Sequence, residues 1–352
     1  MKAVRLHGDG DIRVDQVAEP PDPGPREAVV EPIWSGICGT DVKEFTGHGG
    51  SASREPHPLT GACLPLVLGH EFSARVVAVG PDGGEAAAGD EVAIMPLQHC
   101  GRCPACREGR YTHCARKAWT GLSSPWGGFG ERALVQSYQL TPLAGIPADA
   151  GAVIEPAAVA LHAARRAGIG PGDTVFVAGA GAIGALTVMV AAALGASAVY
   201  VFEVNPRRAC LAASLGAHVI PEDAADDIPG YLRARTGGPG VHVAMDCAGK
   251  PASHAACVAS VRPGGTVGIP SVHPGPAPVD VRRITRDDLT LVGSVGYSQE
   301  SWERTALMVR AGVLPVGRVV TSKIRLDDIV AKGFEVLAKP GGELKILVQV
   351  SE

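Results

Sequence analysis

The sequence predicts a protein of two domains, in which a β-rich domain is interrupted by an α/β domain with a doubly wound parallel sheet. The chain has 352 residues, which exceeds the size at which one hydrophobic core usually splits into two. The pattern of apolar and turn-forming residues changes near residue 156 and again near residue 293. We therefore expect a β-rich domain over residues 1–155, an α/β domain over 156–292, and a C-terminal segment over 293–352 that completes the first domain.

The first 155 residues contain short apolar segments separated by turns rich in glycine and proline. Examples of these segments are "AVVEPIWSGI", "FSARVVAVG", "DEVAIMPL" and "ERALVQSYQL", and each is typical of a β-strand. The polar stretch from Thr46 to Cys63 has no hydrophobic periodicity. A loop of that length inside a compact domain is usually functional.

The second region alternates apolar strands with alanine-rich helices. The strand Thr174–Ala178 leads through a glycine turn into a helix that we expect to begin near Ala182. The following strand precedes Asn205, a predicted N-cap, with proline at the first helical position and Gly216 beyond the helix end. This βαβ alternation predicts a parallel sheet. The chain ends in "ELKILVQV", which we interpret as an alternating strand.

Composition favours a soluble globular protein. Hydrophobic residues make up 46% of the chain, charged residues 19%, and the net charge of −4 argues against nucleic-acid binding. The N-terminus has no apolar segment of a signal peptide, and the longest apolar stretch is too short to span a bilayer. Nine cysteines without a secretory signal indicate a reducing compartment. We expect a cytoplasmic protein without nucleic-acid or membrane partners.

Four of these cysteines occur within fifteen residues, in the loop "CGRCPACREGRYTHC". Short Cys-x₂-Cys turns supply the soft ligands of a tetrahedral zinc ion. The alternatives are an iron–sulfur cluster, whose fourth cysteine normally follows after three residues rather than seven, and disulfides, which the compartment disfavours. Nearby cations, Arg110 among them, could offset part of the thiolate charge. We expect a structural zinc ion bound by Cys100, Cys103, Cys106 and Cys114.

The glycine turn has the pattern Gly179-x-Gly181-x-x-Gly184 between a strand and a helix. In this context the first glycine permits the turn, the second lets a pyrophosphate approach the backbone, and the third lets helix and strand pack closely. The pattern alone is weak in a chain with 46 glycines, but its position predicts a dinucleotide site. A structural turn without ligand is the alternative.

Glu203, at the end of the next strand, indicates which dinucleotide is bound. Its carboxylate can accept hydrogen bonds from the adenosine ribose and would repel a 2′-phosphate. Arg207 and Arg208 follow and could attract such a phosphate. Because the glutamate stands at the strand tip, we expect NAD rather than NADP.

Cys38, His70, Glu71 and Glu155 are further candidate ligands. Taken singly, each has a structural explanation, such as a buried thiol, a core histidine or a charge at a helix N-terminus. Their spacing alone does not link them.

A family resemblance does link them. The motifs "GICGTD", "GHEFS", the cysteine loop, "GGFGE", "EPAAVALHA" and "GAGAIG" occur in an order that resembles the zinc-dependent medium-chain alcohol and polyol dehydrogenases over essentially the whole chain. The segments "PHPLTG", "LVGSVGY" and "TSKIRLDDIVAKGFEVL" are most similar to the 2,3-butanediol dehydrogenase branch, close to sorbitol dehydrogenase. The resemblance implies a GroES-like β domain that carries two zinc ions and an inserted Rossmann domain.

The resemblance implies that Cys38, His70 and a glutamate bind a catalytic zinc. Glu71 and Glu155 occupy positions that bind zinc directly or through water in sorbitol-type relatives. One thiolate, one neutral histidine and one carboxylate leave a zinc site formally neutral, the better Lewis acid. We therefore expect the two glutamates to exchange with water or substrate, and Asp41 to orient His70.

The same resemblance assigns the remaining roles. Hydride passes between the alcohol carbon and the nicotinamide, while Thr40 accepts the proton. Relatives commonly have histidine at the position of Lys43, where a neutral amine is scarce at pH 7, so Lys43 is either a relay group or a surface charge. The expected cofactor-lining residues, besides the three glycines and Glu203, are Ile183, Arg208, Cys247, Ile269, Ser271 and Val295.

These features predict an oxidoreductase that transfers hydride between a secondary alcohol, such as a vicinal diol or polyol like 2,3-butanediol, and NAD. Its partners are a small alcohol or ketone and further copies of the chain, as a dimer or tetramer. The alternatives are a cyclitol, aminocyclitol or sorbitol-type dehydrogenase and, less in keeping with the intact ligand set, a non-catalytic zinc and nucleotide protein. We expect the leftover cysteines to be ordinary buried thiols: Cys63, Cys210, Cys247 and Cys257.

Overall fold

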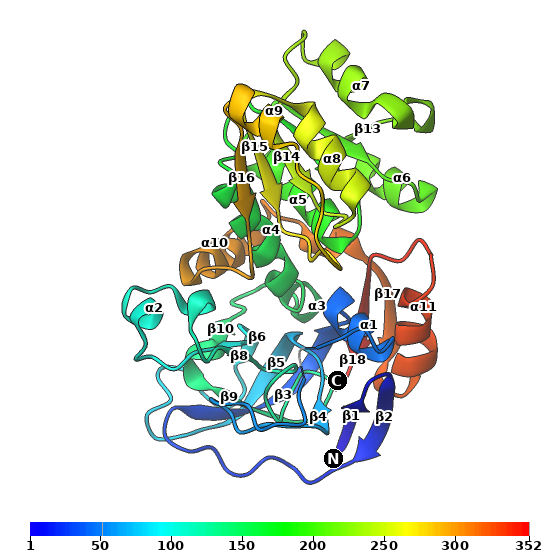
Figure 1. The fold of residues 1–352 in the computed structure, drawn as a ribbon. Coiled ribbons are helices and arrows are strands. Elements are labelled where there is room, and N and C mark those ends of the chain that lie inside the picture. The colour runs from blue at the N-terminus through cyan, green and yellow to red at the C-terminus, as the bar shows by residue number, and fades with distance from the viewer. Residues whose placement is uncertain (51, 352) are drawn as a thin grey trace. The chain divides into compact units, whose positions relative to one another are not determined.

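A computed structural model describes residues 1–50 and 52–351 of the chain (Figure 1). Ser51, within the long loop predicted over residues 46–63, and Glu352, at the end of the predicted C-terminal segment, lie outside the described residues. The chain divides into two compact units. The first contains residues 1–155, 298–312 and 316–352, and the second contains residues 156–297 and 313–315.

The first unit consists mainly of β-strands. Its strands and α-helices are β1 (Lys2–Gly8), β2 (Asp11–Gln16), β3 (Glu27–Gly36), β4 (Leu66–Val67), β5 (Glu71–Val79), β6 (Glu91–Ile94), β7 (Leu97–Gln98), β8 (Ala118–Trp119), β9 (Ala133–Gln136), β10 (Leu140–Pro142), β17 (Val320–Arg325), β18 (Lys345–Gln349), α1 (Gly39–Phe45), α2 (Pro104–Arg107), α3 (Ala148–Gly151), α10 (Gln299–Arg310) and α11 (Glu335–Leu337).

The largest sheet of this unit has the order β10-β6-β5-β3-β18-β17, and β9 also pairs with β3. The inward side chains of β3, β5, β6 and β9 are small or β-branched apolar residues that pack around Phe72 as one hydrophobic core. Such residues fill the space beneath a pleated sheet and stabilise it through burial. The β-rich character predicted for this part of the chain is confirmed.

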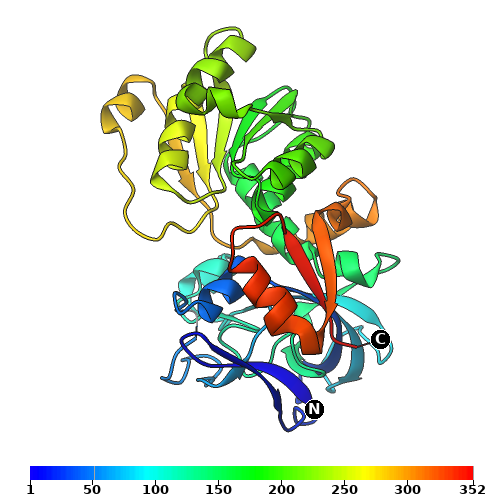
Figure 2. The same ribbon diagram turned by 90° about the vertical axis from the view of Figure 1, so that its right-hand side faces the viewer.

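The last strand, β18, lies between β3 and β17 in this sheet. Figure 2 shows β17 and β18 beside the helical segment that follows residue 325. The predicted alternation of this strand is wrong, because four consecutive residues from Lys345 onward are buried. Ile346 and Val348 belong to a hydrophobic core on one face, whereas the Lys345 side chain reaches Glu71 on the other.

The second unit contains a parallel sheet and most of the longer helices. Its elements are β11 (Thr174–Ala178), β12 (Ala198–Phe202), β13 (His218–Val219), β14 (Val241–Asp246), β15 (Val261–Ile269), β16 (Thr290–Gly293), α4 (Ile154–Arg166), whose first two residues belong to the first unit, α5 (Ala182–Ala193), α6 (Pro206–Ser214), α7 (Ile228–Arg235), α8 (Pro251–Ser260) and α9 (Val281–Arg286).

All strand pairs of this sheet are parallel, and their order is β13-β12-β11-β14-β15-β16. Helices α5 and α6 contact each other and strands β11 to β13, whereas α7 and α8 contact each other and α8 packs on β11, β14 and β15. The predicted doubly wound sheet is therefore confirmed. The chain moves outward from β11 in both directions, so the carboxyl ends of β11 and β14 form the switch point at which such sheets bind ligands.

The capping pattern predicted after Glu203 is also confirmed. The Asn205 side chain accepts hydrogen bonds from the backbone N–H groups of Arg207 and Arg208 and begins α6. Gly216 follows the helix with a φ of +100°, which side-chain-bearing residues rarely adopt. Local signals of this kind require no knowledge of distant contacts. Among the residues that the structure describes, no helix is long and apolar enough to cross a membrane.

Candidate active site and metal centres

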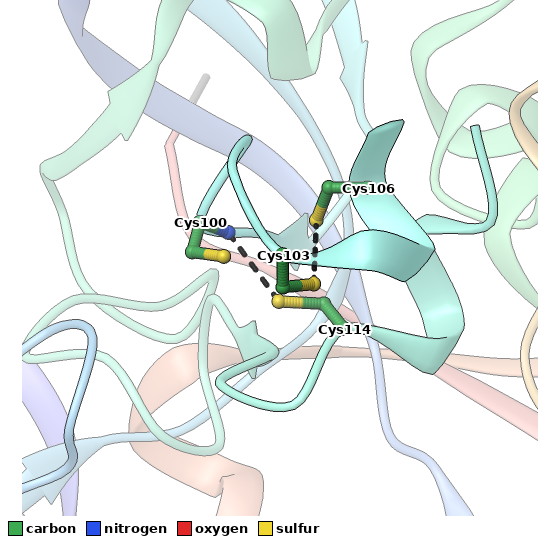
Figure 3. A group of neighbouring side chains, drawn as sticks. All are labelled: Cys100, Cys103, Cys106 and Cys114. Carbon is green, nitrogen blue, oxygen red and sulfur yellow. Dashed lines mark hydrogen bonds between the residues drawn. The ribbon is translucent and has the colours of Figure 1, made fainter. Parts of the chain in front are cut away.

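The four cysteines of the loop lie together as the ligands of one metal ion would (Figure 3). Cys103 is the N-cap of α2, which carries Cys106, and Cys114 ends a short 3-10 turn. The four Sγ atoms all lie within 4.8 Å of one another, and those of Cys103 and Cys106 are 3.5 Å apart. Four sulfurs bound tetrahedrally at about 2.3 Å would be about 3.8 Å apart. The donor set fits zinc.

The thiols of this loop do not share one electrostatic environment. Hydrogen bonds from the backbone N–H groups of Arg102 and Cys103 lower the pKa of Cys100 to about 5, whereas burial raises the pKa of Cys106 to about 12. Because the Cys106 thiolate is disfavoured by burial, four thiolates require a cation among them. This requirement again fits a bound divalent metal.

Backbone N–H groups of the loop donate to its sulfurs, whereas the Arg110 side chain pairs with a carboxylate. The Cys114 Sγ accepts hydrogen bonds from the backbone N–H groups of Cys100 and Arg116, both at 3.4 Å. The Arg110 guanidinium donates from Nε to Glu108 Oε2 at 2.8 Å instead of facing the sulfurs. Of the cations expected to offset part of the thiolate charge, Arg110 thus pairs with Glu108, and Arg102, Arg107, Arg116 and Lys117 stay candidates.

A second group of ligand atoms lies where β3 and β5 meet. Gly36, the last residue of β3, pairs with Glu71, the first residue of β5, so Cys38 at the start of α1 comes next to His70 and Glu71. The ligand atoms of these three residues lie within 4.8 Å of one another. A Cβ at Gly36 would overlap Glu71 Oε2, so glycine leaves room for the carboxylate.

The surroundings of His70 attract positive charge. Burial lowers the pKa of His70, but the negative charges of Asp41 and Cys38 outweigh this effect and raise the pKa well above its usual value. Asp41 Oδ1 lies 3.4 Å from His70 Nδ1 without the alignment of a hydrogen bond, and Asp41 Oδ2 accepts from the Cys38 backbone N–H at 3.0 Å. A site that stabilises a cation beside a thiolate and an imidazole fits a zinc ion.

Lys345 is a residue of this site that the sequence analysis missed. Its ammonium lies 2.5 Å from Glu71 Oε2 and donates to the Ile37 carbonyl at 3.0 Å. Burial lowers the pKa of Lys345, but the charges of Glu71, Cys38 and Glu155 raise it above its usual value. A buried lysine in an apolar strand was the available signal, because lysine is almost never fully buried without a partner.

Glu155, Thr40 and Lys43 are placed differently with respect to the three-ligand group. Glu155, buried in the first turn of α4, lies near enough for its charge to act on Lys345, but among the described residues the group within 4.8 Å does not include it. Thr40 Oγ1 lies 3.8 Å from Cys38 Sγ. Lys43 is exposed on the same helix. Thr40 is therefore beside the site, and Lys43 is at the surface.

The glycine turn of the second unit has the close contacts that a dinucleotide cradle requires. Gly179 has a φ of +91°, and Gly181 is the N-cap of α5. A Cβ at Gly184 would overlap the Gly179 carbonyl oxygen, so the helix can approach the strand only with glycine there. The N-terminus of α5, where the first N–H groups of a helix have no partner within the helix, is therefore a candidate site for a phosphate.

Glu203 lies next to this turn. Its Oε2 accepts a hydrogen bond from the Ala180 backbone N–H at 2.7 Å, and its Oε1 accepts from the Asn205 N–H at 2.8 Å. These bonds hold the carboxylate at the end of β12, beside the cradle. Arg208 is half-buried in α6, and Arg207 is exposed.

The other predicted cofactor-lining residues gather at the same edge of the sheet. The register pairs Ala178 with Asp246 and Ile269 with Gly293, so the carboxyl ends of β11, β14, β15 and β16 lie side by side. Ile183 lies in the first turn of α5 at this edge, and the residues that follow these strands include Cys247, Ser271 and Val295. Cys247 donates its N–H to the Ala178 carbonyl at 3.0 Å, and burial raises the pKa of its thiol to about 12.

The prediction that all leftover cysteines are buried is wrong for two of them. Cys257 is buried in α8 and Cys247 is half-buried, but Cys63 and Cys210 are exposed. Cys63 ends the polar loop that precedes β4, and Cys210 lies on the outer face of α6, which has few buried residues. Residue type alone did not indicate this exposure.

Comparison with known proteins defines the class. Residues 24–145 match the alcohol dehydrogenase GroES-like domain, and residues 182–310 match the zinc-binding dehydrogenase family. An (R,R)-butanediol dehydrogenase from Bacillus subtilis is 34% identical over 99% of both chains, and a sorbitol dehydrogenase from that organism is 31% identical over 93% of this chain and 91% of its own. The chain therefore belongs to the zinc-dependent medium-chain alcohol and polyol dehydrogenases, in their butanediol and sorbitol dehydrogenase branch.

Solved structures agree with this assignment. The crystal structure of 2R,3R-butanediol dehydrogenase from Bacillus subtilis superposes with a TM-score of 0.93 at 32% identity and covers 99% of both chains. A zinc-binding dehydrogenase from Sinorhizobium meliloti, bound to NADP, has a TM-score of 0.89 at 31% identity over 99% of both chains. The β-rich part has the GroES-like fold and the parallel sheet the Rossmann-type fold. The protein is an oxidoreductase of secondary alcohols that uses zinc and a nicotinamide cofactor, and its substrates are small alcohols and ketones.

Proposed function

We propose that this enzyme oxidises one hydroxyl group of a vicinal diol or polyol, of the size of 2,3-butanediol, and transfers the hydride to NAD. The observation that carries the proposal is the close group of Cys38, His70 and Glu71, which combines one thiolate, one imidazole and one carboxylate. That donor set is typical of a catalytic zinc site with an open position. The butanediol and sorbitol dehydrogenases among its relatives support the diol or polyol class.

We further propose two zinc ions per chain. Cys100, Cys103, Cys106 and Cys114 would hold a structural zinc, because four protein ligands leave no position for a substrate. Cys38, His70 and a glutamate would hold the second, and when bound there the ion would supply the Lewis acidity that makes an alcohol proton easier to remove. Thr40 Oγ1, beside Cys38, is the proposed first acceptor of that proton.

The position of Lys345 leads us to propose that Glu71 and Glu155 differ in how they bind the zinc ion. The Cys38 thiolate and the carboxylates of Glu71 and Glu155 carry three negative charges, which the Lys345 ammonium and one zinc ion would balance. Because Lys345 already pairs with Glu71, we propose that it competes with the metal for that carboxylate. The metal would then hold Glu71 less firmly, and Glu155 would be the glutamate that binds the metal in exchange with water or substrate. Lys43, exposed three residues after Thr40, would pass the proton to solvent.

We propose NAD as the preferred cofactor because of Glu203. Its carboxylate is held beside the glycine turn by two backbone hydrogen bonds, where a 2′-phosphate would meet a fixed negative charge. The positive charge of Arg208 would attract a 2′-phosphate and so favour NADP, but Arg208 lies on the helix beyond the strand tip. The proposed cofactor-lining residues are Gly179, Gly181, Ile183, Gly184, Cys247, Ile269, Ser271 and Val295.

We infer that the first unit forms the catalytic domain and the second the dinucleotide-binding domain, so that residues 293–297 and 313–315, which the sequence analysis assigned to the C-terminal segment, join the dinucleotide-binding domain. We also propose a cytoplasmic location, since thiols bind zinc only when reduced, and a homodimer or homotetramer by analogy with the family. Light scattering of the purified protein gives the number of chains directly.

The experiment that tests the proposed function compares substrates side by side. Zinc-loaded protein is assayed for NADH formation with the stereoisomers of 2,3-butanediol, with sorbitol and with inositol-type cyclitols, and a simple monoalcohol serves as the control. We expect kcat/KM to be highest for one butanediol stereoisomer. A higher kcat/KM for sorbitol or for a cyclitol would assign the enzyme to polyols or to cyclitols instead. The absence of turnover with every diol and polyol would exclude the proposal.

A further inference from the structure

A third group of potential metal ligands lies in the second unit and shares no residue with the two centres described above. It consists of Asp246, His254 and His273, whose ligand atoms lie within 4.8 Å of one another. Asp246 is the last residue of β14, His254 lies in the first turns of α8, and His273 lies in the segment after β15. Three separate elements thus bring these side chains to the carboxyl edge of the sheet.

The Asp246 carboxylate presents one of its two oxygens to the histidines. Oδ1 is occupied, because it accepts hydrogen bonds from the Gly249 backbone N–H at 3.1 Å and the Ser253 hydroxyl at 2.8 Å. Oδ2 lies 2.9 Å from His273 Nε2 and 3.7 Å from His254 Nδ1. The first oxygen therefore fixes the orientation of the carboxylate, and the second is aimed between the two rings.

Two of the three residues are buried, His273 is partly exposed, and among the described residues no lysine or arginine forms an ion pair with the group. Asp246 is completely buried and His254 is 3% exposed. In the part of the chain that the structure describes, every ion-pair partner of Asp246 is a histidine, and His254 Nδ1 has no hydrogen-bond partner. A buried carboxylate is costly unless a positive charge compensates it. A metal ion beside Oδ2 would supply that charge.

We propose that Asp246, His254 and His273 form a third metal site, for a divalent transition metal such as zinc. Two imidazole nitrogens and one carboxylate oxygen are a common ligand set for these ions, with water at a fourth position. Ligands bound tetrahedrally at about 2.0–2.1 Å are about 3.3 Å apart. The two distances from Asp246 Oδ2 lie on either side of that value, so small side-chain movements would complete the site.

A metal ion at this position would fasten a segment without regular structure to the sheet. Residues 270–280 contain four prolines and form no helix or strand, and His273 reaches from this segment to β14. Asp246 is the register partner of Ala178, which immediately precedes the glycine turn. The proposed ion would therefore stabilise the edge of the second unit that carries the glycine turn.

Metal binding tests the proposal without reference to catalysis. The full-length protein is desalted after zinc loading and dialysed against increasing free Zn²⁺, and zinc per chain is measured by mass spectrometry. Variants His254→Gln and His273→Gln each remove one ligand, and the amide introduced by His273→Gln can still donate a hydrogen bond to Asp246. His218→Gln is the matched control, because His218 is an exposed histidine of the same unit that contacts the Tyr200 ring.

We expect the wild-type protein and His218→Gln to bind one more zinc ion per chain than His254→Gln and His273→Gln. We also compare the rise in unfolding midpoint that added zinc causes in each protein. At a free Zn²⁺ concentration about one hundred times the Kd of this site, this rise should be larger in the wild-type protein than in either variant by about 5 °C or more. The proposal is overturned if both variants bind as much zinc as the control, or if the wild-type protein gains no zinc beyond that of the variants. Because the comparison counts a difference between variants, it is independent of the proposed substrate and of the metal content of the cysteine sites.

Discussion

Replacing Lys345 with methionine removes the ammonium group that pairs with Glu71 and keeps most of the side-chain volume. The Lys345 and Glu71 side chains are only 2% and 1% exposed, so water cannot replace the lost partner. Breaking a buried ion pair by removing one member costs about 3–5 kcal/mol, whereas an exposed pair contributes about 0.2–1 kcal/mol. We therefore expect Lys345→Met to lower the free energy of unfolding of the first unit by about 3–5 kcal/mol, a large part of the ~5–15 kcal/mol typical of a folded protein.

Tryptophan fluorescence during denaturant unfolding measures this change. All four tryptophans, at positions 34, 119, 126 and 302, belong to the first unit. Zinc-free protein is used, so that metal binding to Glu71 does not mask the loss. The control is Lys332→Met, which breaks an exposed pair with Asp328 at 3.2 Å and should cost less than about 1 kcal/mol.

A double variant separates the ion pair from other effects of the substitution. Glu71→Gln/Lys345→Met removes both charges, so it should recover most of the stability that Lys345→Met loses. The reasoning would be refuted if Lys345→Met were no less stable than Lys332→Met. It would also be refuted if the free energy of unfolding lost in the double variant equalled the sum of the losses in the two single variants.

Three further predictions concern the cofactor site and the cysteine loop. Glu203→Gln should raise the ratio of kcat/KM for NADP to that for NAD by about tenfold or more, equivalent to ~1.4 kcal/mol, and an unchanged ratio would remove Glu203 from cofactor selection. Gly184→Val should abolish measurable NAD binding in a fluorescence titration, because even a Cβ at Gly184 overlaps the Gly179 carbonyl; retained affinity would contradict the cradle. After chelation of zinc, Cys100 should be alkylated by iodoacetamide at pH 6.5, above its pKa of about 5, and react more slowly below pH 5 as the thiolate is protonated. Zinc should protect Cys100, whereas the buried Cys257 thiol, whose pKa burial raises well above its usual value, should stay unmodified; labelling of Cys257 in place of Cys100 would contradict this assignment.

Features set by neighbouring residues were predictable from the sequence. The N-cap of α6 at Asn205 and the glycine turn before α5 follow from residues that lie within a few positions of one another. The cysteine loop is similar, because short turns deliver its four sulfurs to one place. The fold class followed from the change in periodicity along the chain and is confirmed by the sheet topology.

Contacts between distant parts of the chain were not predictable from spacing. Lys345 meets Glu71 across a separation of 274 residues, and only the placement of β18 beside β3 brings them together. The same limit applies to His273 and Asp246, which meet because β14 and β15 are parallel neighbours. Resemblance linked Cys38 to His70, but neither resemblance nor periodicity indicated a buried lysine beside them.

The zinc content and turnover of Cys38→Ala test most directly the claim that the Cys38 group, rather than the cysteine loop, holds the metal that supports the reaction. After zinc loading and desalting, we expect this variant to contain one zinc ion fewer per chain than the wild-type protein and to form no NADH from any diol. With zinc removed from both proteins, its tryptophan-monitored unfolding midpoint should stay close to that of the wild-type protein, because the loop and the hydrophobic cores are unchanged. Wild-type zinc content or measurable turnover in Cys38→Ala would contradict the account.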